Sequence, residues 1–401
     1  GTYAISGNNV STSILTITAG TIVNNNGTVS LDGSGVAVLT GSGTFNNLAT
    51  GILNIQGGVG IAAAVTITTF NASTAGNSVH YDGAGNQGVH KPTDNSYSNL
   101  VIEISGTKSF DAAVTIGVSS GLTIKDAAIF NVSTNTLNGA GTLTMTGTSN
   151  LQIAKLGTEP ELTGVYSLTA GTVTLNGAGA QTLATPSNTG PNPSSNTYYN
   201  LMLSGSGAKV ITGLTTINGD FTVAGTATIA SSNSVFTQDC SHTFYYQSTA
   251  GTSTLSNSVT IGNFNMSGAG TLADGGFNIT TCGSTFTKSA GTYTSTGRVT
   301  FNAASTAVTS SGGTFTFKNV TINSGMTMVA DVNGISIGNG GSADWTNNGT
   351  FTHNNGTITS VGNITIQGSS LTTFYHLTIS AGTLTGHATQ MFIQGNWTNN
   401  G

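Results

Sequence analysis

The sequence predicts an all-β fold, a parallel β-solenoid, on three observations. Short runs of alternating apolar and polar residues recur along the whole chain, as in Ser13–Thr18 and Gly141–Thr146, and this period-two pattern is typical of strands with one buried face. Gly, Asn and Ser separate the runs, and these residues favour tight turns. Longer phrases also repeat with a drifting spacing, which a solenoid tolerates because each turn contacts only its neighbours.

Composition indicates a folded chain with very little charge. Charged residues are 5% of the 401 residues, against about 25% in ordinary soluble domains. Hydrophobic residues are 36%, enough for a buried core, so disorder is not expected. The eight Lys and Arg residues are too few for the basic patch that nucleic acid requires. No apolar run approaches the roughly 18 residues of a membrane-spanning helix.

The repeated phrases are degenerate, and they recur along the whole length. One phrase places an aromatic residue three positions before Leu or Val, with Asn or His between them. It occurs at Phe45–Leu48, Tyr97–Leu100, Tyr198–Leu201, Phe317–Val320 and Phe374–Leu377. A second phrase pairs Asp or Asn with an aromatic residue, and it occurs at Gly219–Thr222, Gly262–Asn265, Ala343–Thr346 and Gly395–Thr398.

Two other β architectures fit the sequence less well than the solenoid. A propeller needs a fixed blade pattern and ring closure, which the drifting spacing disfavours. Tandem sandwiches need about 100 residues each and linkers between them, and no linker-like change of composition divides the chain. We therefore predict one continuous, single-stranded solenoid over residues 1–401, with turns of roughly 20 residues. Two segments with unusual composition, near residues 80–96 and 181–199, are predicted to project as loops.

The two ends of the chain carry parts of one repeated phrase. Trp345–Gly349 reads Trp-Thr-Asn-Asn-Gly, and Trp397–Gly401 repeats it. In the first copy Thr and an aromatic residue follow, and the chain begins with Gly, Thr and Tyr. This pattern is expected either of a segment of a longer chain or of a subunit that associates end to end. The predicted head-to-tail junction comprises Gly1, Thr2, Tyr3, Trp397, Asn399, Asn400 and Gly401.

Few residues suggest chemistry. His80, Asp82 and His90 could approach a metal ion, but their Gly-rich surroundings favour a solvated loop. Glu159 and Glu161, with Lys155 nearby, form the densest acidic pair, and two carboxylates are what glycoside hydrolysis needs. The intervening proline favours a surface turn instead. We therefore predict no catalytic residue, no metal and no cofactor.

The chain has two cysteines, Cys240 and Cys282. Their sequence separation corresponds to about two turns, or about 9.6 Å along the stack. A disulfide needs Cα atoms within about 7 Å, so a bridge requires a shift of register between the turns. A disulfide and two unbridged thiols both remain open.

Other polar and aromatic patterns each have two interpretations. Asn24–Asn26, Asn347–Asn348 and Asn354–Asn355 can form side-chain ladders between turns or simply occupy turns. The frequent Thr-x-Thr pairs can form an ice-binding array, but their irregular spacing favours ordinary β-propensity. Packing in the core or at strand edges is favoured over sugar stacking for four tyrosines, Tyr198, Tyr199, Tyr245 and Tyr246.

Several phrases resemble the repeats of giant secreted surface proteins of Bacteroidetes-type bacteria. They are Tyr198–Lys209, Thr216–Val223, Gly291–Thr294 and Trp345–Phe351. Such proteins are broadly similar to filamentous adhesins and autotransporter passengers. The resemblance implies a secreted, right-handed β-solenoid used for adhesion or as a fibre, and it offers no catalytic residue to carry over.

The resulting expectation is an extracellular, non-enzymatic structural protein of the bacterial cell surface. It would act as a fibre-forming or adhesive β-solenoid, associating end to end or continuing in a longer chain, with surface polysaccharide as a partner. The alternative is a carbohydrate-active or carbohydrate-binding β-helix protein, similar to a polysaccharide lyase or hydrolase.

Overall fold

The computed structural model describes residues 1–60, 63–110, 115–184, 196–211, 213–230, 235–339, 341–386 and 391–401. Its elements are β-strands that pair in parallel with strands of neighbouring turns. Register partners in paired strands of neighbouring turns lie from 19 residues apart, as at Thr357 and His376, to 26 apart, as at Ile52 and Ser78. The predicted parallel β-solenoid is therefore confirmed, with turns slightly longer than expected.

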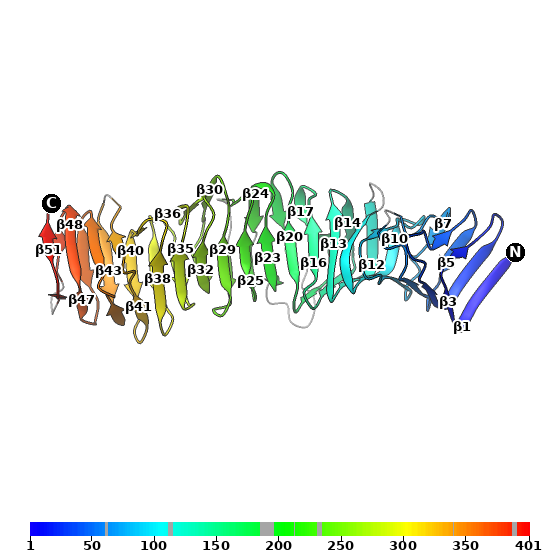
Figure 1. Ribbon diagram of the computed structural model, residues 1–401, viewed down its shortest axis with the longest axis horizontal. Helices are drawn as coiled ribbons and strands as arrows, with labels where there is room; N and C mark the ends of the chain where they lie inside the picture. Colours follow the sequence, from blue (N-terminus) through cyan, green and yellow to red (C-terminus); the bar gives the residue numbers. More distant parts are fainter. Residues whose placement is uncertain are drawn as a thin grey trace. The chain divides into compact units, whose positions relative to one another are not determined.

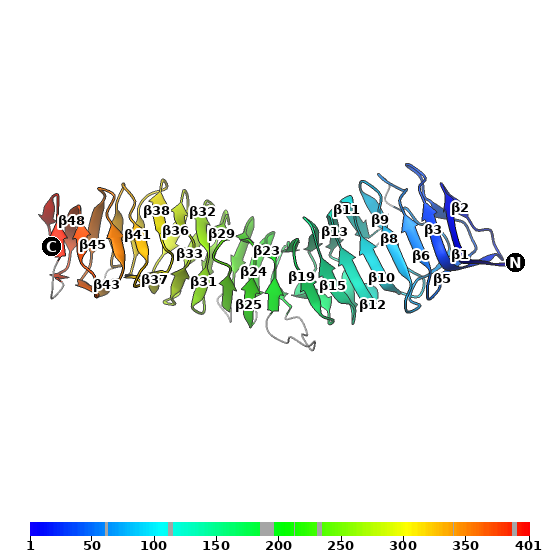
Figure 2. The same ribbon diagram turned by 90° about the horizontal axis from the view of Figure 1, so that it is seen from below.

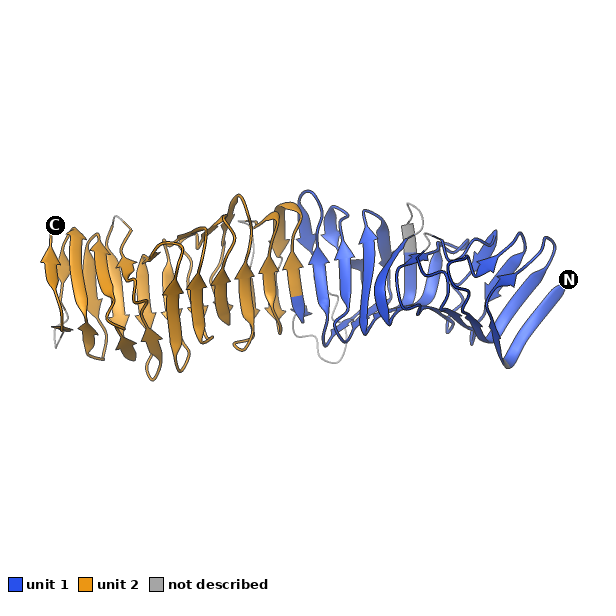
Figure 3. Ribbon diagram, in the orientation of Figure 1, with its two compact units in different colours: residues 1–200 blue, residues 201–401 orange. Residues whose placement is uncertain are grey.

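The chain divides into two compact units, residues 1–200 and 201–401 (Figure 3). Each is a solenoid in which strands of successive turns lie side by side (Figure 1 and Figure 2). The sequence does not signal this division, because the same strand and turn patterns occur on both sides of it.

In unit 1, one sheet bends around a corner of the coil where two of its long strands, β3 and β12, each pair with two shorter strands. β3 pairs with both β5 and β6, and β12 pairs with both β14 and β15. The strands of this sheet are β1 (Thr2–Thr12), β3 (Ile22–Leu31), β5 (Thr44–Asn47), β6 (Ile52–Ile55), β7 (Thr69–Asn71), β8 (Ser78–Tyr81), β10 (Ser96–Ile102), β12 (Thr115–Ile124), β14 (Thr136–Gly139), β15 (Thr142–Met145), β18 (Glu161–Leu162) and β19 (Tyr166–Leu168).

A second sheet of unit 1 closes the coil. Its strands are β9 (Gln87–Val89), β11 (Ser105–Phe110), β13 (Ala127–Ser133), β16 (Asn150–Ile153) and β20 (Thr172–Leu175). Short strands complete the unit: β2 (Leu15–Thr16) pairs with β4 (Leu39–Thr40), β17 (Gly157–Glu159) pairs with β21 (Gln181–Leu183), and β22 (Asn196–Tyr198) ends it.

In unit 2 each turn places strands on successive faces of the coil. Face one consists of β25 (Leu214–Ile217), β28 (Val235–Gln238), β31 (Val259–Ile261), β34 (Ile279–Thr281), β37 (Arg298–Phe301), β40 (Asn319–Ile322), β43 (Ala343–Asn347), β46 (Ile364–Gln367) and β49 (Leu384–Thr385). Face two consists of β23 (Asn200–Leu203), β26 (Phe221–Val223), β29 (Thr243–Tyr246), β32 (Asn263–Met266), β35 (Thr285–Lys288), β38 (Thr306–Ser310), β41 (Thr327–Val329) and β44 (Thr350–Thr352).

Face three of unit 2 is divided into shorter sheets. They are β24 (Ser206–Ile211) with β27 (Thr226–Ile229), then β30 (Thr252–Thr254), β33 (Thr271–Ala273) and β36 (Thr292–Thr294), then β39 (Phe315–Phe317), β42 (Ile335–Ile337), β45 (Thr357–Val361), β48 (His376–Ala381) and β51 (Trp397–Asn399). β47 (Thr372–Phe374) and β50 (Met391–Ile393) pair with each other.

Phenylalanines on face two stack from turn to turn in the interior of unit 2. Phe221, Phe244, Phe264 and Phe286 are register partners in successive turns, and each is at most 1% exposed. Neighbouring ring centroids lie 4.8, 5.7 and 4.6 Å apart. Such ring pairs contribute about 0.5–1.5 kcal/mol beyond the burial of their area. The alternation of buried and outward residues thus builds a continuous apolar column.

Asparagine ladders run between turns of unit 1. Buried Asn25 donates from Nδ2 to Asn47 Oδ1 over 2.9 Å. In the neighbouring outward column, Asn46 Nδ2 donates to Asn24 Oδ1, and Asn71 Nδ2 donates to Asn46 Oδ1, each over 2.8 Å. The ladder interpretation therefore holds for Asn24 and Asn25.

The other asparagine pairs do not form side-chain ladders of this kind. Asn354 and Asn355 have φ angles of 47° and 57° and occupy a turn. Asn347 caps its own turn, because its Oδ1 accepts from Gly349 N over 3.1 Å, and its Nδ2 donates to Leu371 O over 2.9 Å. Asn348 Oδ1 accepts a hydrogen bond from Ser369 N in the next turn.

The predicted loop at residues 80–96 is wrong. This segment contains the end of β8, the whole of β9 and the first residue of β10, and β9 pairs with β11. Tyr81 and Val89 are fully buried. Sequence reasoning failed here because the charged residues lie at outward positions and corners between strands that are too short to show a period. Of the second predicted loop, residues 185–195 lie outside the described residues, and 181–183 and 196–198 are strands.

Candidate functional site

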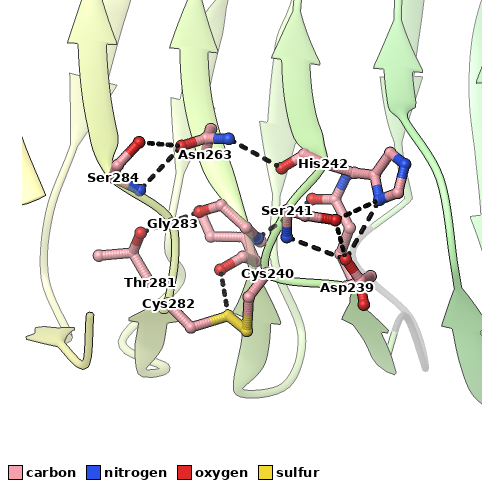
Figure 4. Close-up of a disulfide and its surroundings, with 12 residues drawn as sticks. Asp239, Cys240, Ser241, His242, Asn263, Thr281, Cys282, Gly283 and Ser284 are labelled. Carbon is pink, nitrogen blue, oxygen red and sulfur yellow. Dashed lines mark hydrogen bonds and ion pairs between the residues drawn. A yellow bond between two sulfur atoms is a disulfide. The ribbon is translucent and has the colours of Figure 1, made fainter. Parts of the chain in front are cut away.

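Cys240 and Cys282 form a disulfide in unit 2 (Figure 4). The S–S distance is 2.10 Å, and the Cα atoms are 5.1 Å apart. Cys240 follows β28 and Cys282 follows β34, so the bridge skips the intervening turn that contains β31. The Cα atoms are therefore closer than the distance of about 9.6 Å that a separation of two turns predicts, and the disulfide forms across the intervening turn.

Unequal corner lengths explain how the bridge spans two turns. The corner between β28 and β29 has four residues, Asp239–His242, whereas Gly262 alone connects β31 to β32. The longer corner closes over the shorter one, since a Cβ on Gly262 would lie 2.2 Å from His242 O and 2.5 Å from Asp239 O. The main chain at Cys240 is thereby displaced toward the turn that carries Cys282.

Asp239 organises the corner that carries Cys240. Its Oδ1 accepts hydrogen bonds from Ser241 N over 2.9 Å and from Ser241 Oγ over 2.5 Å (Figure 4). These bonds, with a further contact to His242 Nδ1 at 3.2 Å, lower the pKa of Asp239. Although Asp, Ser and His lie together, Ser241 and Asp239 both approach the same ring nitrogen of His242. A Ser-His-Asp triad uses both ring nitrogens, so this arrangement is a capped turn.

The acidic pair predicted near Lys155 is brought together in unit 1. Lys155 Nζ lies 3.0 Å from Glu159 Oε1 and also contacts Glu161 Oε1. Burial raises the pKa of Glu159 to about 7, against the opposing hydrogen bond from Lys155. Burial alone would lower the pKa of Lys155, but the hydrogen bonds with Glu161 and Glu159 outweigh it and raise that pKa. The lysine thus bridges the two carboxylates.

His80, Asp82 and His90 do not converge on one point. His80 Nδ1 lies 2.7 Å from Glu103 Oε1, and Asp82 accepts from Gln56 over 3.2 Å. The backbone N–H of His90 donates to Tyr81 Oη. Among the described residues, no group of three or more His, Cys, Asp or Glu side chains could hold a metal ion.

Glu103, which sequence reasoning did not single out, is the centre of this charged cluster. It also contacts Lys125. Burial opposes its ionisation, yet the hydrogen bonds with Lys125 and His80 lower its pKa. The sequence places Glu103 just beyond a strand, with no local signal of its partners one turn away.

Buried polar corners are a second feature that sequence reasoning missed. Lys108 is fully buried, and its Nζ donates to Gly83 O, Gly85 O and Ser105 O over 2.5, 2.5 and 3.0 Å. Burial lowers the pKa of Lys108 to about 8. Buried Gln87 binds the same corner by accepting from Gly83 N, and it donates to Ile55 O and Gly57 O of the preceding turn. The repeated Gly-Ala-Gly-x-Gln phrase, at Gly83–Gln87 and Gly177–Gln181, was the available signal.

Threonines form an in-register outward column on face one of unit 2. One threonine per turn pairs with the next, and the column consists of Thr216, Thr237, Thr260, Thr280, Thr300, Thr321 and Thr346. Because the turns vary in length, threonines that are register partners are unevenly spaced in the sequence. Irregular spacing of the Thr-x-Thr pairs therefore does not exclude an in-register threonine column. The neighbouring outward column contains Arg298, Asn319 and Asp344, so the face is not a uniform threonine surface.

A polar hollow of about 340 Å³ lies on unit 2 at face two and its following corner. Three of the residues that line it, Asn265, Thr287 and Thr309, are register partners in successive turns. The last residues of β35 and β38 and the corner residues that follow complete the lining; they are Lys288, Ser289, Ser310, Ser311, Asp331, Val332 and Asn333. Apart from Val332, every residue that lines the hollow carries a polar side chain.

The tyrosines weighed from sequence fall into two groups. Tyr198 and Tyr246 are fully buried, as the packing interpretation requires. Tyr246 Oη donates to Thr271 O over 2.7 Å. Tyr245 and Tyr199 are partly exposed, and Tyr245 pairs in register with Asn265 of the hollow.

The residues of the predicted junction lie in β1 and β51 or directly beside them. Thr2 and Tyr3 pair with Ile22 and Val23 through β1, and Gly1 N donates to Gly20 O. In unit 2, Trp397 and Asn399 belong to β51 and pair with residues of β48, while Asn400 N donates to Ile379 O and Gly401 N donates to Asn399 Oδ1. Tyr3 is 64% exposed and Trp397 is 48% exposed.

Comparison with protein-family models, with curated protein sequences and with solved structures finds no match to this chain. Within the described residues, no helix is long and apolar enough to cross a membrane.

Proposed function

We propose that the chain is an extracellular, non-enzymatic structural protein, a fibre-forming or adhesive β-solenoid of the bacterial cell surface. The observation that carries the proposal is the interior column of phenylalanines in unit 2, stacked through Phe221, Phe244, Phe264 and Phe286. Close-packed interiors resist deformation, and parallel ladders add backbone hydrogen bonds between turns. A unit built in this way suits a mechanical role.

The disulfide supports the extracellular part of the proposal. Cys240 is exposed and Cys282 is partly exposed, so a reducing cytosol would have access to the bridge. Disulfides persist mainly in oxidising compartments outside the cytosol. By joining turns that are not neighbours, the bridge also limits separation of the turn between them.

The charged groups favour a non-catalytic role. Lys155 occupies the position between Glu159 and Glu161, and Glu103 is bound by both His80 and Lys125. Ion pairs of this kind stabilise corners that would otherwise contain uncompensated charge. We infer that these ion-pair clusters stabilise the corners of the solenoid in which they lie.

Single-molecule force spectroscopy on the full chain tests the mechanical role. The oxidised chain should resist extension and unfold in discrete force peaks. Because the bridge encloses a sequence separation of 42 residues, about 140–150 Å of contour length at roughly 3.3–3.6 Å per residue should appear only after reduction. The double variant Cys240→Ser/Cys282→Ser is the control, and it should give the long contour with or without reductant. Extension at low force without peaks would contradict the proposal.

Location and assembly are tested separately. Antibody against the folded chain should label intact producing cells without permeabilisation, and labelling that requires permeabilisation would contradict a surface location. For fibre formation, sedimentation velocity over rising protein concentration should show growing assemblies. A single monomeric species at all concentrations would contradict fibre formation by self-assembly. The adhesive role would then be the part of the proposal that stands.

A further inference from the structure

We propose that the polar hollow on unit 2 is a subsite for a neutral saccharide, and that a glycan chain lies along face two across β32, β35 and β38. The hollow has a volume of about 340 Å³, which falls in the range of about 300–1,000 Å³ found for small-molecule sites. The inference is independent of a mechanical role, since a rigid coil can bind a glycan whether or not it forms fibres.

Free hydrogen-bonding groups converge on the hollow. Within the described part of the chain, the side-chain polar groups of Asn265, Ser289, Thr309 and Ser311 have no hydrogen-bond partner. Thr287 Oγ1 donates to Phe264 O over 3.1 Å and keeps the ability to accept. Hydroxyls and amides both donate and accept, and sugar hydroxyls require this dual character of a binding site.

A buried carboxylate oxygen at the hollow also lacks a partner. Asp331 is 3% exposed. Its Oδ1 accepts from Asn333 N over 2.9 Å, while Oδ2 has no partner among the described residues. An unsatisfied buried acceptor is destabilising. A bound hydroxyl that reached Oδ2 through a small rotation of the side chain would recover part of this cost.

Register extends the polar surface beyond the hollow. Tyr245, Asn265, Thr287 and Thr309 are partners in successive turns, at about 4.8 Å per turn. Tyr245 is partly exposed and pairs in turn with Thr222 of the preceding turn. Its ring presents an apolar face beside a polar group, which suits the C–H face of a pyranose. A linear glycan along the column would therefore meet an aromatic ring, then an amide, then hydroxyls.

Other ligand classes fit the hollow less well. An apolar ligand needs a mainly apolar lining, and Val332 is the apolar residue here. The cation among the lining residues, Lys288, is 7% exposed, donates to Thr314 O over 3.3 Å and lies 5.5 Å from the Phe315 ring centroid. Because this ammonium is engaged with the interior and Asp331 is acidic, an anionic ligand is disfavoured. A neutral sugar remains.

Binding by the full-length chain to defined hexasaccharides tests the proposal. Isothermal titration would use cello-, manno-, laminari- and chito-hexaose, with hexagalacturonate as the acidic arm. At least one neutral hexasaccharide should bind saturably at millimolar concentration, and hexagalacturonate should not. Absence of saturable binding to every neutral probe, or binding of hexagalacturonate alone, would overturn the proposal.

Matched variants locate the site. Thr287→Val/Thr309→Val removes two hydroxyls from face two while keeping β-branched residues, and binding should weaken about 10–30-fold for two lost hydrogen bonds. Thr280→Val/Thr300→Val makes the same change in register partners on face one and should leave affinity unchanged. Tyr245→Ala should also weaken binding. Equal affinity of the two double variants, with unchanged far-UV circular dichroism, would overturn the assignment to face two.

Discussion

At the scale of single residues, buried side-chain hydrogen bonds and the disulfide join one turn of the solenoid to another. Asn47 lies 1% exposed in the interior of unit 1, where it accepts from Asn25 and donates from Nδ2 to Ser78 O over 2.9 Å. Asn46 makes a similar ladder one residue away, at an outward position. The two side chains thus make comparable bonds in different environments. Water can replace a lost hydrogen bond at the outward position, where Asn46 lies, but not at the interior position of Asn47.

These asparagines provide a matched pair of variants. Asn47→Ala removes the acceptor of one N–H of buried Asn25, whose amide keeps its bond to Ile52 O, and it removes the side-chain donor to the carbonyl of partly buried Ser78. We expect the free energy of unfolding to fall by about 1–3 kcal/mol. Asn46→Ala should cost less than about 1 kcal/mol, because solvent reaches its partners. Urea denaturation followed by circular dichroism measures both changes. Equal losses would show that burial does not control the strength of the ladder.

Removal of the disulfide has a predictable effect on stability. For a loop defined by a sequence separation of 42 residues, the chain-entropy model predicts a loss of about 4 kcal/mol at most. Cys282→Ser should therefore lower the urea midpoint of unit 2. Reductant should lower the wild-type midpoint to the same value and leave the variant unchanged. A reductant effect on Cys240→Ser/Cys282→Ser would point to a different cause.

At the scale of elements, copies of the repeated aromatic phrase in unit 2 mark a corner between two strands, whereas the copy at Tyr97–Leu100 lies within β10. In Phe317–Val320 the aromatic residue is the last buried position of β39, and Val320 is the first buried position of β40. Phe374–Leu377 connects β47 to β48 in the same way. The spacing of these copies is uneven because they belong to corners and the lengths of the turns vary. Their role as corners could be assigned only once strand pairing was known.

Lys108, which lies in β11, is expected to make the free energy of unfolding depend on pH. Its pKa of about 8 in the fold lies below the roughly 10.4 expected when unfolded. Between these values the unfolded state binds more protons, so stability rises with pH. From pH 7.5 to 9.5, the free energy of unfolding of the wild type should rise by about 2 kcal/mol relative to Lys108→Met, at 1.36 kcal/mol for each unit above pH 8. Denaturation curves at both pH values measure this, and parallel profiles would contradict it.

For the molecule as a whole, low charge is the property with the broadest physical consequence. The net charge is −5 over 401 residues, with eight Lys and Arg, and Lys108, Lys209 and Lys288 are buried. Stability therefore depends on the apolar interior and on ladders of neutral side chains and backbone groups, and salt screens neither. Hydration of the surface by hydroxyls and amides is likewise independent of pH.

This composition predicts stability that is insensitive to ionic strength. Exposed ion pairs such as Arg298–Asp344, at 3.3 Å, contribute about 0–1 kcal/mol each. Between 0.05 and 1 M NaCl, the free energy of unfolding should change by less than about 1 kcal/mol. Asp344→Asn is the control variant. It removes the carboxylate of this ion pair, so the change in its free energy of unfolding between the two salt concentrations should be smaller than that of the wild type. A loss of several kcal/mol in salt would show that screened charges contribute substantially to the stability of the fold.

The sequence by itself determined the all-β class, the parallel solenoid and the approximate length of a turn. Period-two alternation and frequent turn residues are local properties, and each turn needs only its neighbours, so local patterns were sufficient. Tertiary structure alone decided which residues one turn apart become partners, because unequal corners such as Asp239–His242 and Gly262 shift the register. The disulfide, the threonine column and the polar hollow all depend on that register, and the sequence does not display it.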